Sequence, residues 1–205
     1  MALDLAPGHD IGWSDSDDLT SIAGPAIQGR AEAGSDVTVY LDGTALGATR
    51  ANASGVWTYA MPEDTAEGSH QVTARATDAA GNRSGLSGAY AFTLDLTAPS
   101  AISAPDLLPG SDTGRSTTDN LTHDTSPILQ GAAEPGTRTA LFLNGTLLDT
   151  LVPGQDGRWS YTLTDLPHRD HVVSVASMDE AGNLSSRASL GVEVDTRAPA
   201  DVAPP

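Results

Sequence analysis

Apolar and more polar residues alternate along several short stretches of the chain. Val37, Val39 and Leu41 show this alternation, and it occurs again at residues 57–59, 72–76 and 90–94. A strict period of two predicts β-strands with one buried and one solvated face, as in antiparallel sheets. No stretch combines the 3.6-residue period of a helix with helix end signals. The pattern therefore predicts an all-β protein.

The alternating pattern occurs twice. The segment Asp4–Gly12 returns as Asp106–Gly114, an offset of 102 residues that shortens to 100 by Asp195. The strand-like stretches recur at residues 139–143, 159–161, 173–175 and 190–194. A period near 100 is too long for a solenoid unit and suits a domain with its own core. We therefore predict two domains, residues 1–105 and 106–205.

Turn signals separate the predicted strands. Asp42-Gly43 and Asn144-Gly145 each lie between two alternating stretches. They predict two-residue hairpin turns, because a type I′ turn needs positive φ at both central positions. About seven short antiparallel strands per copy predict an immunoglobulin-like β-sandwich in each domain. We expect Trp57 and Trp159 to be the largest apolar side chains of the two cores.

Composition qualifies this picture. Leu, Ile, Val and Phe together make 39 of 205 residues, about 19%, and the net charge is −17. Both values lie at the edge of the range of disordered chains, so we expect lean cores. The 27 acidic residues, of which 21 are Asp, oppose binding to nucleic acid or anionic lipid. The absence of Cys excludes disulfides and thiolate chemistry.

The ends of the sequence give expectations about its context. Pro205 corresponds to Pro105, so the chain stops where a third copy would begin. We therefore expect a fragment of a longer array, monomeric in isolation and with neighbouring repeats as its partners. Residues 1–10 lack the features of a signal peptide, and no apolar run reaches 18 residues. We expect export signals to lie outside this sequence and no direct membrane insertion.

Each copy carries the same series of motifs. The series begins with Asp-x-Gly-x-Ser-x-x-Asp-(Asp/Asn)-Leu-Thr, continues with Gln-Gly, Leu-(Asp/Asn)-Gly-Thr and Gly-x-Trp-x-Tyr, and ends with Asp-x-Ala-Gly-Asn-x-Ser and Asp-x-x-Ala-Pro. Over nearly all of residues 4–205 it resembles the bacterial Ig-like repeats of large Gram-negative surface adhesins of the RTX or biofilm-associated type. The resemblance implies an extracellular stalk, or extender, that supports adhesion or biofilm formation and is often stiffened by calcium near domain junctions.

Acidic residues gather where calcium could bind. Ca²⁺ takes about six to eight oxygen ligands, chiefly carboxylates, carbonyls and water. Assuming the usual Ig strand order, we expect two sites. The first set is Asp10, Asp17, Asp18 and Asp78, and the second, at the junction, is Asp95, Asp112, Asp119 and Asp179. The competing interpretation is that these aspartates form Asx-turns in solvent.

Other functions stay open at this point. No Gly-x-Ser-x-Gly, phosphate-loop or His-Glu-x-x-His motif occurs, and an active site has no need of two degenerate copies, so we expect no enzyme. A ligand-binding module for a glycan or host protein is an alternative, with Trp13, Tyr40, Tyr90 and Phe142 as unrepeated aromatic residues. An accessory module of a secreted polysaccharide-degrading enzyme is another. His70 and His171 recur, and we expect both to be structural.

Overall fold

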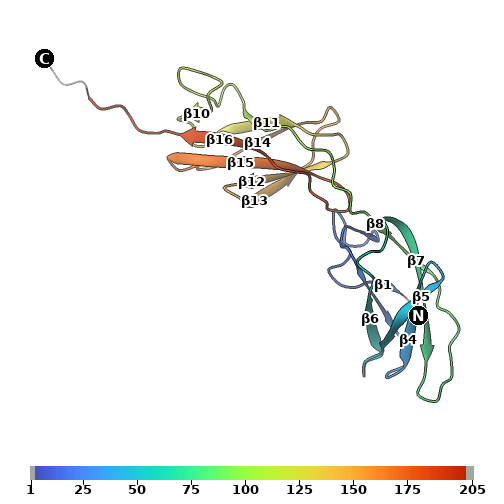
Figure 1. Ribbon diagram of the computed structural model, residues 1–205. Coiled ribbons are helices and arrows are strands. Elements are labelled where there is room, and N and C mark those ends of the chain that lie inside the picture. The colour runs from blue at the N-terminus through green and yellow to red at the C-terminus, as the bar shows by residue number, and fades with distance from the viewer. Residues whose placement is uncertain (1–2, 202–205) are drawn as a thin grey trace. The chain divides into compact units, whose positions relative to one another are not determined.

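The computed structural model describes residues 3–201, which fold into two compact units. One unit is Met1–Thr97 with Glu180–Asn183, and the other is Ala98–Asp179 with Leu184–Pro205. Figure 1 shows the two copies, here called domain 1 and domain 2, as separate sets of strands, blue to green and yellow to red. Ile102 lies before Asp106, the predicted start of the second copy, but its side chain packs in the hydrophobic core of domain 2.

Domain 1 is a sandwich of two sheets. Its strands are β1 (Asp4–Leu5), β2 (Leu19–Thr20), β3 (Ala26–Arg30), β4 (Asp36–Leu41), β5 (Thr44–Arg50), β6 (Val56–Ala60), β7 (Gly68–Thr77) and β8 (Tyr90–Leu94). One sheet has the order β1-β3-β6 and the other β2-β8-β7-β4-β5. The alternating residues of β4 and β7 face the space between the sheets, so Val37, Val39, Val72 and Ala74 are fully buried.

Domain 2 repeats this arrangement. Its strands are β9 (Asp106–Leu107), β10 (Leu121–Thr122), β11 (Ile128–Ala132), β12 (Arg138–Leu143), β13 (Thr146–Leu151), β14 (Arg158–Thr162), β15 (Arg169–Met178) and β16 (Ala188–Val194). The sheets have the orders β9-β11-β14 and β10-β16-β15-β12-β13. The predicted fold class, two tandem Ig-like sandwiches without helices in residues 3–201, is therefore confirmed.

One edge of each larger sheet differs from the antiparallel expectation. The two-residue strand β2 pairs in parallel with β8, and β10 pairs in parallel with β16. Each domain consequently has eight strands, two of them only two residues long. Two residues are too few to show a hydrophobic period, which is why the sequence pattern did not indicate these strands. They matter because each one follows directly after an acidic loop.

A tryptophan lies at the centre of each core. Trp57 is 2% exposed and stands opposite Gly29 in the register of β6 and β3. A Cβ atom at Gly29 would lie 2.6 Å from Trp57 Cζ2, so only glycine leaves room for the indole ring. Gly131 and Trp159 have the same relation in domain 2. The repeated Gln-Gly and Gly-x-Trp motifs are thus two halves of one packing contact.

The two predicted hairpin turns are confirmed. Asp42 and Gly43, between β4 and β5, have φ values of 49° and 81°, and Asn144 and Gly145 have 50° and 86°. Positive φ at both central positions is the condition for a type I′ turn. Within the described residues there is no helix long and apolar enough to cross a membrane.

Candidate calcium-binding loops

The first acidic loop, Asp10–Asp18, lies in domain 1 just before β2. Its chain reverses through Gly12, with φ of 115°, and Asp18, with φ of 61°. Asp10 Oδ2 accepts a hydrogen bond from the Asp18 backbone N–H at 3.3 Å, which closes the loop. Asp17 Oδ1 accepts another from Leu19 N–H at 3.2 Å, an Asx-type turn. Asp10, Asp17 and Asp18 are therefore held within one short loop, as predicted from their spacing.

The second acidic loop, Asp112–Asn120, has the same internal geometry. Asp112 Oδ2 accepts from Asn120 N–H at 3.2 Å, and Asp119 Oδ1 accepts from Leu121 N–H at 3.2 Å. Gly114 and Asn120 have φ values of 109° and 60°, close to those of Gly12 and Asp18. The two loops are consequently one structural motif in two copies, and not two unrelated acidic segments.

Buried oxygen atoms without partners mark both loops. Within residues 3–201, Asp10 Oδ1, Asp112 Oδ1 and Asn120 Oδ1 are buried and accept no hydrogen bond. The Asp112 side chain belongs to a residue only 1% exposed. An unpaired buried acceptor costs about 1–3 kcal/mol, and more when it carries charge. These oxygens are the groups that a bound cation would satisfy.

The charge of the first loop adds to this cost. Burial raises the pKa of Asp10, and the charges of Asp17, Asp18 and Asp15 raise it further, against a lowering by the hydrogen bond from Asp18 N–H. Ionisation of Asp10 is thus less favourable in this loop than for a fully solvated carboxyl group. A divalent cation would reverse the sign of this effect, because it attracts the same carboxylate.

The two loops differ in the contacts of their last residue, which is Asp18 before β2 and Asn120 before β10. In domain 1 the Tyr90 hydroxyl donates to Asp18 Oδ1 at 2.5 Å and accepts from Leu5 N–H at 3.0 Å. The repeat offset places Leu190, which has no hydroxyl group, at the equivalent position of domain 2. Tyr90 therefore occupies an oxygen of Asp18, whereas Asn120 Oδ1 has no partner among the described residues. This role of Tyr90 could not be seen in the sequence, where Tyr90 is an unrepeated aromatic residue.

Asp95 lies at the same end of domain 1 as the acidic loop. Its backbone N–H donates to Thr20 O at 3.0 Å, next to the parallel pair β2–β8, and its Oδ1 accepts from Thr97 N–H at 3.0 Å. Asp195 has the same backbone bond to Thr122 O at 2.8 Å in domain 2. Asp95 was predicted to act with Asp112, Asp119 and Asp179, whereas within its own domain it accompanies the first acidic loop.

Asp78 lies at the opposite end of domain 1, so its predicted grouping with Asp10, Asp17 and Asp18 is wrong. The acidic loop leads into β2, which pairs with β8, and the end of β8 pairs with the first residues of β7. Asp78, in contrast, directly follows the last residue of β7. The ten residues of β7 span roughly 30 Å. Asp78 accepts hydrogen bonds from Asn82 N–H at 2.8 Å and Ala80 N–H at 2.9 Å, an Asx-turn. Its side-chain bond with Asn82, together with these backbone bonds, lowers the pKa of Asp78.

The predicted second set is divided in the same way. Asp112 and Asp119 precede β10, which leads through β16 to the first residues of β15, whereas Asp179 follows the last residue of β15. One set of ligands cannot include all three within a domain. The error came from the assumed strand order, which placed both loops at one end. Among residues 3–201, no group of three or more His, Cys, Asp or Glu side chains is close enough to hold a metal.

Two of the four unrepeated aromatic residues, Phe142 and Tyr90, have contacts within their own domains. Phe142 is 5% exposed and lies beneath the Arg187 guanidinium, whose Cζ is 3.5 Å from the ring centroid. The Tyr90 hydroxyl is occupied by Asp18 and Leu5. Two of the four residues that would serve a glycan- or protein-binding face are therefore engaged within their own domains.

Solved structures similar to this chain include fibronectin(III)-like modules and bacterial adhesins. The fibronectin(III)-like modules of Clostridium thermocellum CbhA share 13% identity over 98% of this chain and 99% of that chain, with a TM-score of 0.53. A Ca²⁺-stabilised adhesin that helps an Antarctic bacterium bind ice shares 22% identity over 96% of this chain and 49% of that chain, with a TM-score of 0.45. A 1.5-MDa bacterial ice-binding adhesin shares 20% identity over 94% of this chain and 62% of that chain, with a TM-score of 0.44. This chain thus spans about half the length of the first adhesin chain and about three fifths of the length of the second.

Similarity of sequence identifies the family. No curated protein matches the chain. The family model described as the bacterial Ig-like domain matches residues 1–96 and again residues 98–196, which are the two repeats. Each match covers one of the two sandwiches, including its acidic loop and its Trp–Gly contact. The chain therefore belongs to the bacterial Ig-like domain family, of which it contains two tandem copies.

Proposed function

We propose that the two domains are tandem extender modules of a bacterial cell-surface adhesin and that calcium bound at the acidic loops stiffens them. The observation that carries the proposal is the repetition of one complete sandwich with the same acidic loop. A spacer gains length from every added copy, because each copy has its own core and folds as a unit. A catalytic site gains nothing from a degenerate second copy, so we propose no enzymatic activity.

The calcium part of the proposal rests on the unpaired oxygens. Calcium would draw together Asp10, Asp17 and Asp18 in domain 1, whose side chains are not grouped closely enough to hold a metal in the structure itself. In domain 2 it would do the same with Asp112, Asp119 and Asn120. These residues offer carboxylate and amide oxygens, the donors that Ca²⁺ prefers, with backbone carbonyls and water to complete the shell. Calcium would supply positive charge to loops whose carboxylates repel one another. Ligand roles for Asp78, Asp95 and Asp179 remain predictions, at the domain ends where these residues lie.

The expected energy of binding is modest. Extracellular modules bind Ca²⁺ with Kd values of about 10⁻⁴–10⁻³ M, so millimolar calcium adds roughly 0.5–1.5 kcal/mol per site. Such an amount changes the folding of a domain little. It is sufficient to decide whether a linker with a small interface of its own is ordered. We therefore propose an extracellular, cell-surface location, where millimolar calcium is available, with neighbouring repeats as partners.

The test uses the full two-domain chain with calcium and with chelator. We expect millimolar CaCl2 to raise the melting temperature by a few degrees and to narrow the distribution of sizes seen by small-angle scattering. The double variant Asp10→Asn, Asp112→Asn should lose both effects. Asp64→Asn, which removes an exposed carboxylate outside the loops, should keep them. Equal melting and scattering with calcium and chelator would disprove the calcium part of the proposal.

A further inference from the structure

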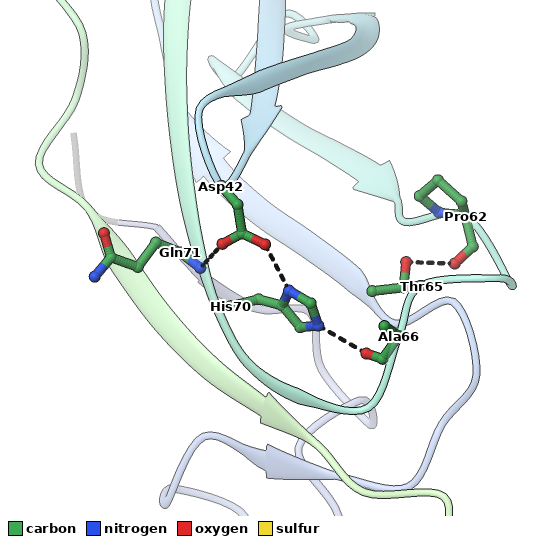
Figure 2. A network of polar contacts seen from close by, with 6 residues as sticks. All are labelled: Asp42, Pro62, Thr65, Ala66, His70 and Gln71. Carbon is green, nitrogen blue, oxygen red and sulfur yellow. Dashed lines mark hydrogen bonds and ion pairs between the residues drawn. The ribbon is translucent and has the colours of Figure 1, made fainter.

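The two recurring histidines have different partners in the two domains. In domain 1, His70 Nδ1 lies 2.7 Å from Asp42 Oδ2, and Nε2 lies 2.7 Å from the Ala66 carbonyl oxygen (Figure 2). The other oxygen of Asp42 accepts from Gln71 N–H at 2.8 Å. This contact network joins the β4–β5 turn, the start of β7 and the loop after β6. It belongs to neither acidic loop.

The geometry around His70 favours a doubly protonated ring. A carboxylate and a backbone carbonyl accept hydrogen bonds and donate none. A neutral imidazole has one N–H, so it can serve only one of these two acceptors and must turn a lone pair toward the other. The imidazolium has two N–H groups and serves both.

Domain 2 has an amide where domain 1 has the carboxylate. Asn144 Nδ2 lies 3.2 Å from His171 Nδ1, and Asn144 Oδ1 accepts from Val172 N–H at 3.0 Å. His171 Nε2 lies 3.0 Å from the Pro167 carbonyl oxygen. Here a neutral ring completes the set, because Nδ1 accepts from the amide and Nε2–H donates to the carbonyl. Domain 2 therefore contains the same contacts without an ion pair.

The surroundings of His70 leave Asp42 in control of its charge. His70 is largely buried, with the Phe92 ring of β8 at a centroid distance of 5.5 Å. Among residues 3–201, Asp42 is the only charged group that acts on the ring. Glu67, in the loop after β6, is engaged by Leu96 N–H and by the Thr97 hydroxyl.

Burial opposes the charged ring, but the hydrogen bonds to Asp42 and Ala66 outweigh it and raise the pKa of His70. The Gln71 N–H bond, followed by that of His70, lowers the pKa of Asp42. Both shifts favour the ion pair, in agreement with the hydrogen-bond geometry.

We propose that His70 and Asp42 form a pH-dependent latch that ties the β4–β5 turn to the loop after β6, and that domain 2 has no such latch. The stabilisation by His70 is complete below its ordinary pKa of about 6.5 and is lost as the pH rises through the raised value. The stabilisation by Asp42 is complete above about pH 3.9 and is lost as the pH falls through the lowered value. Loss of this latch should therefore weaken domain 1 as the pH rises above about 6.5.

The sequence itself supplies matched variants for the test. Asp42→Asn copies the residue that domain 2 carries at an equivalent turn with the same φ, and its amide oxygen can still accept from Gln71 N–H. Asn144→Asp makes the reciprocal change in domain 2. Both variants are studied in the full chain, with hydrogen exchange of the β7 and β15 amides giving the stability of each domain separately.

We expect the folding equilibrium constant of domain 1 to fall about two- to fivefold between pH 6 and pH 8.5, since half-exposed ion pairs contribute little more. Asp42→Asn should remove this change, and Asn144→Asp should introduce it into domain 2. In the natural chain at pH 6, nitrogen NMR should show both ring nitrogens of His70 protonated. An unprotonated ring nitrogen at pH 6, or an unaltered pH dependence in Asp42→Asn, would overturn the proposal. The NMR measurement needs no variant and therefore decides the matter even if a variant fails to fold.

Discussion

At the scale of single residues, Tyr90 shows how one hydroxyl group holds the first acidic loop. It donates to Asp18 and accepts from Leu5 N–H, so it joins the N-terminal strand, the loop and β8. Burial raises the pKa of the Tyr90 phenol, and the bond to Asp18 raises it further, so the group stays protonated and able to donate.

We predict that Tyr90→Phe destabilises domain 1 by about 1–3 kcal/mol, because it leaves a carboxylate oxygen and a backbone N–H without their partner. Urea unfolding of the full chain measures the loss. Tyr161→Phe is the control, since the Tyr161 hydroxyl has no hydrogen-bond partner among the described residues. Equal losses in the two variants would show that the hydroxyl contacts of Tyr90 contribute nothing specific to the stability of domain 1.

The residues of the candidate site were predictable only in part. Asp10, Asp17 and Asp18 lie close in sequence, and so do Asp112 and Asp119, so spacing alone placed them together. The contact of Tyr90 with Asp18 spans 72 residues and exists in one copy only, so neither spacing nor the repeat could indicate it. The ion pair of His70 with Asp42 was missed for a related reason. The recurrence of histidine was visible, but the change of its partner from Asp to Asn gained meaning only from the contacts.

At the scale of elements, the alternating pattern predicted which faces of the strands are buried, and strand length decided where the loops lie. The ten-residue strands β7 and β15 carry Asp78 and Asp179 to the far ends of their domains. The sequence showed the alternation in these strands but not which neighbour each end meets. The register with β8 and β16 supplied that information, and it separated residues that the assumed strand order had grouped.

The pairing of β3 with β6 depends on the contact between Gly29 and Trp57. A methyl group at Gly29 would meet the indole ring, so we predict that Gly29→Ala destabilises domain 1 by about 1–3 kcal/mol through overpacking. Gly88→Ala is the control, because a Cβ atom there has open space around it. The measurement is the urea midpoint of each variant in the full chain. An unchanged midpoint for Gly29→Ala would mean that the indole ring can move aside without cost.

At the scale of the whole molecule, the net charge of −17 acts against compactness, and two kinds of cation effect could relieve it. Dissolved salt screens the repulsion between exposed carboxylates, and the screening grows steadily with ionic strength. An ion bound in each acidic loop would instead add two positive charges per site. Two such ions would change the net charge from −17 to −17 + 4 = −13. The two effects differ in concentration range and in their dependence on the kind of cation.

We predict that CaCl2 raises the melting temperature of the chelator-treated chain with saturation in the millimolar range, whereas NaCl at equal ionic strength gives a smaller and non-saturating rise. MgCl2 should resemble NaCl, because Mg²⁺ demands near-ideal octahedral geometry and gives up its water reluctantly. Loops built around an Asx-type turn and one inward carboxylate oxygen offer Ca²⁺ the irregular coordination that it tolerates. Calorimetry at matched ionic strength separates the three salts. Equal effects of CaCl2 and MgCl2 would assign the stabilisation to screening, and the acidic loops would then be solvated turns that keep the chain soluble.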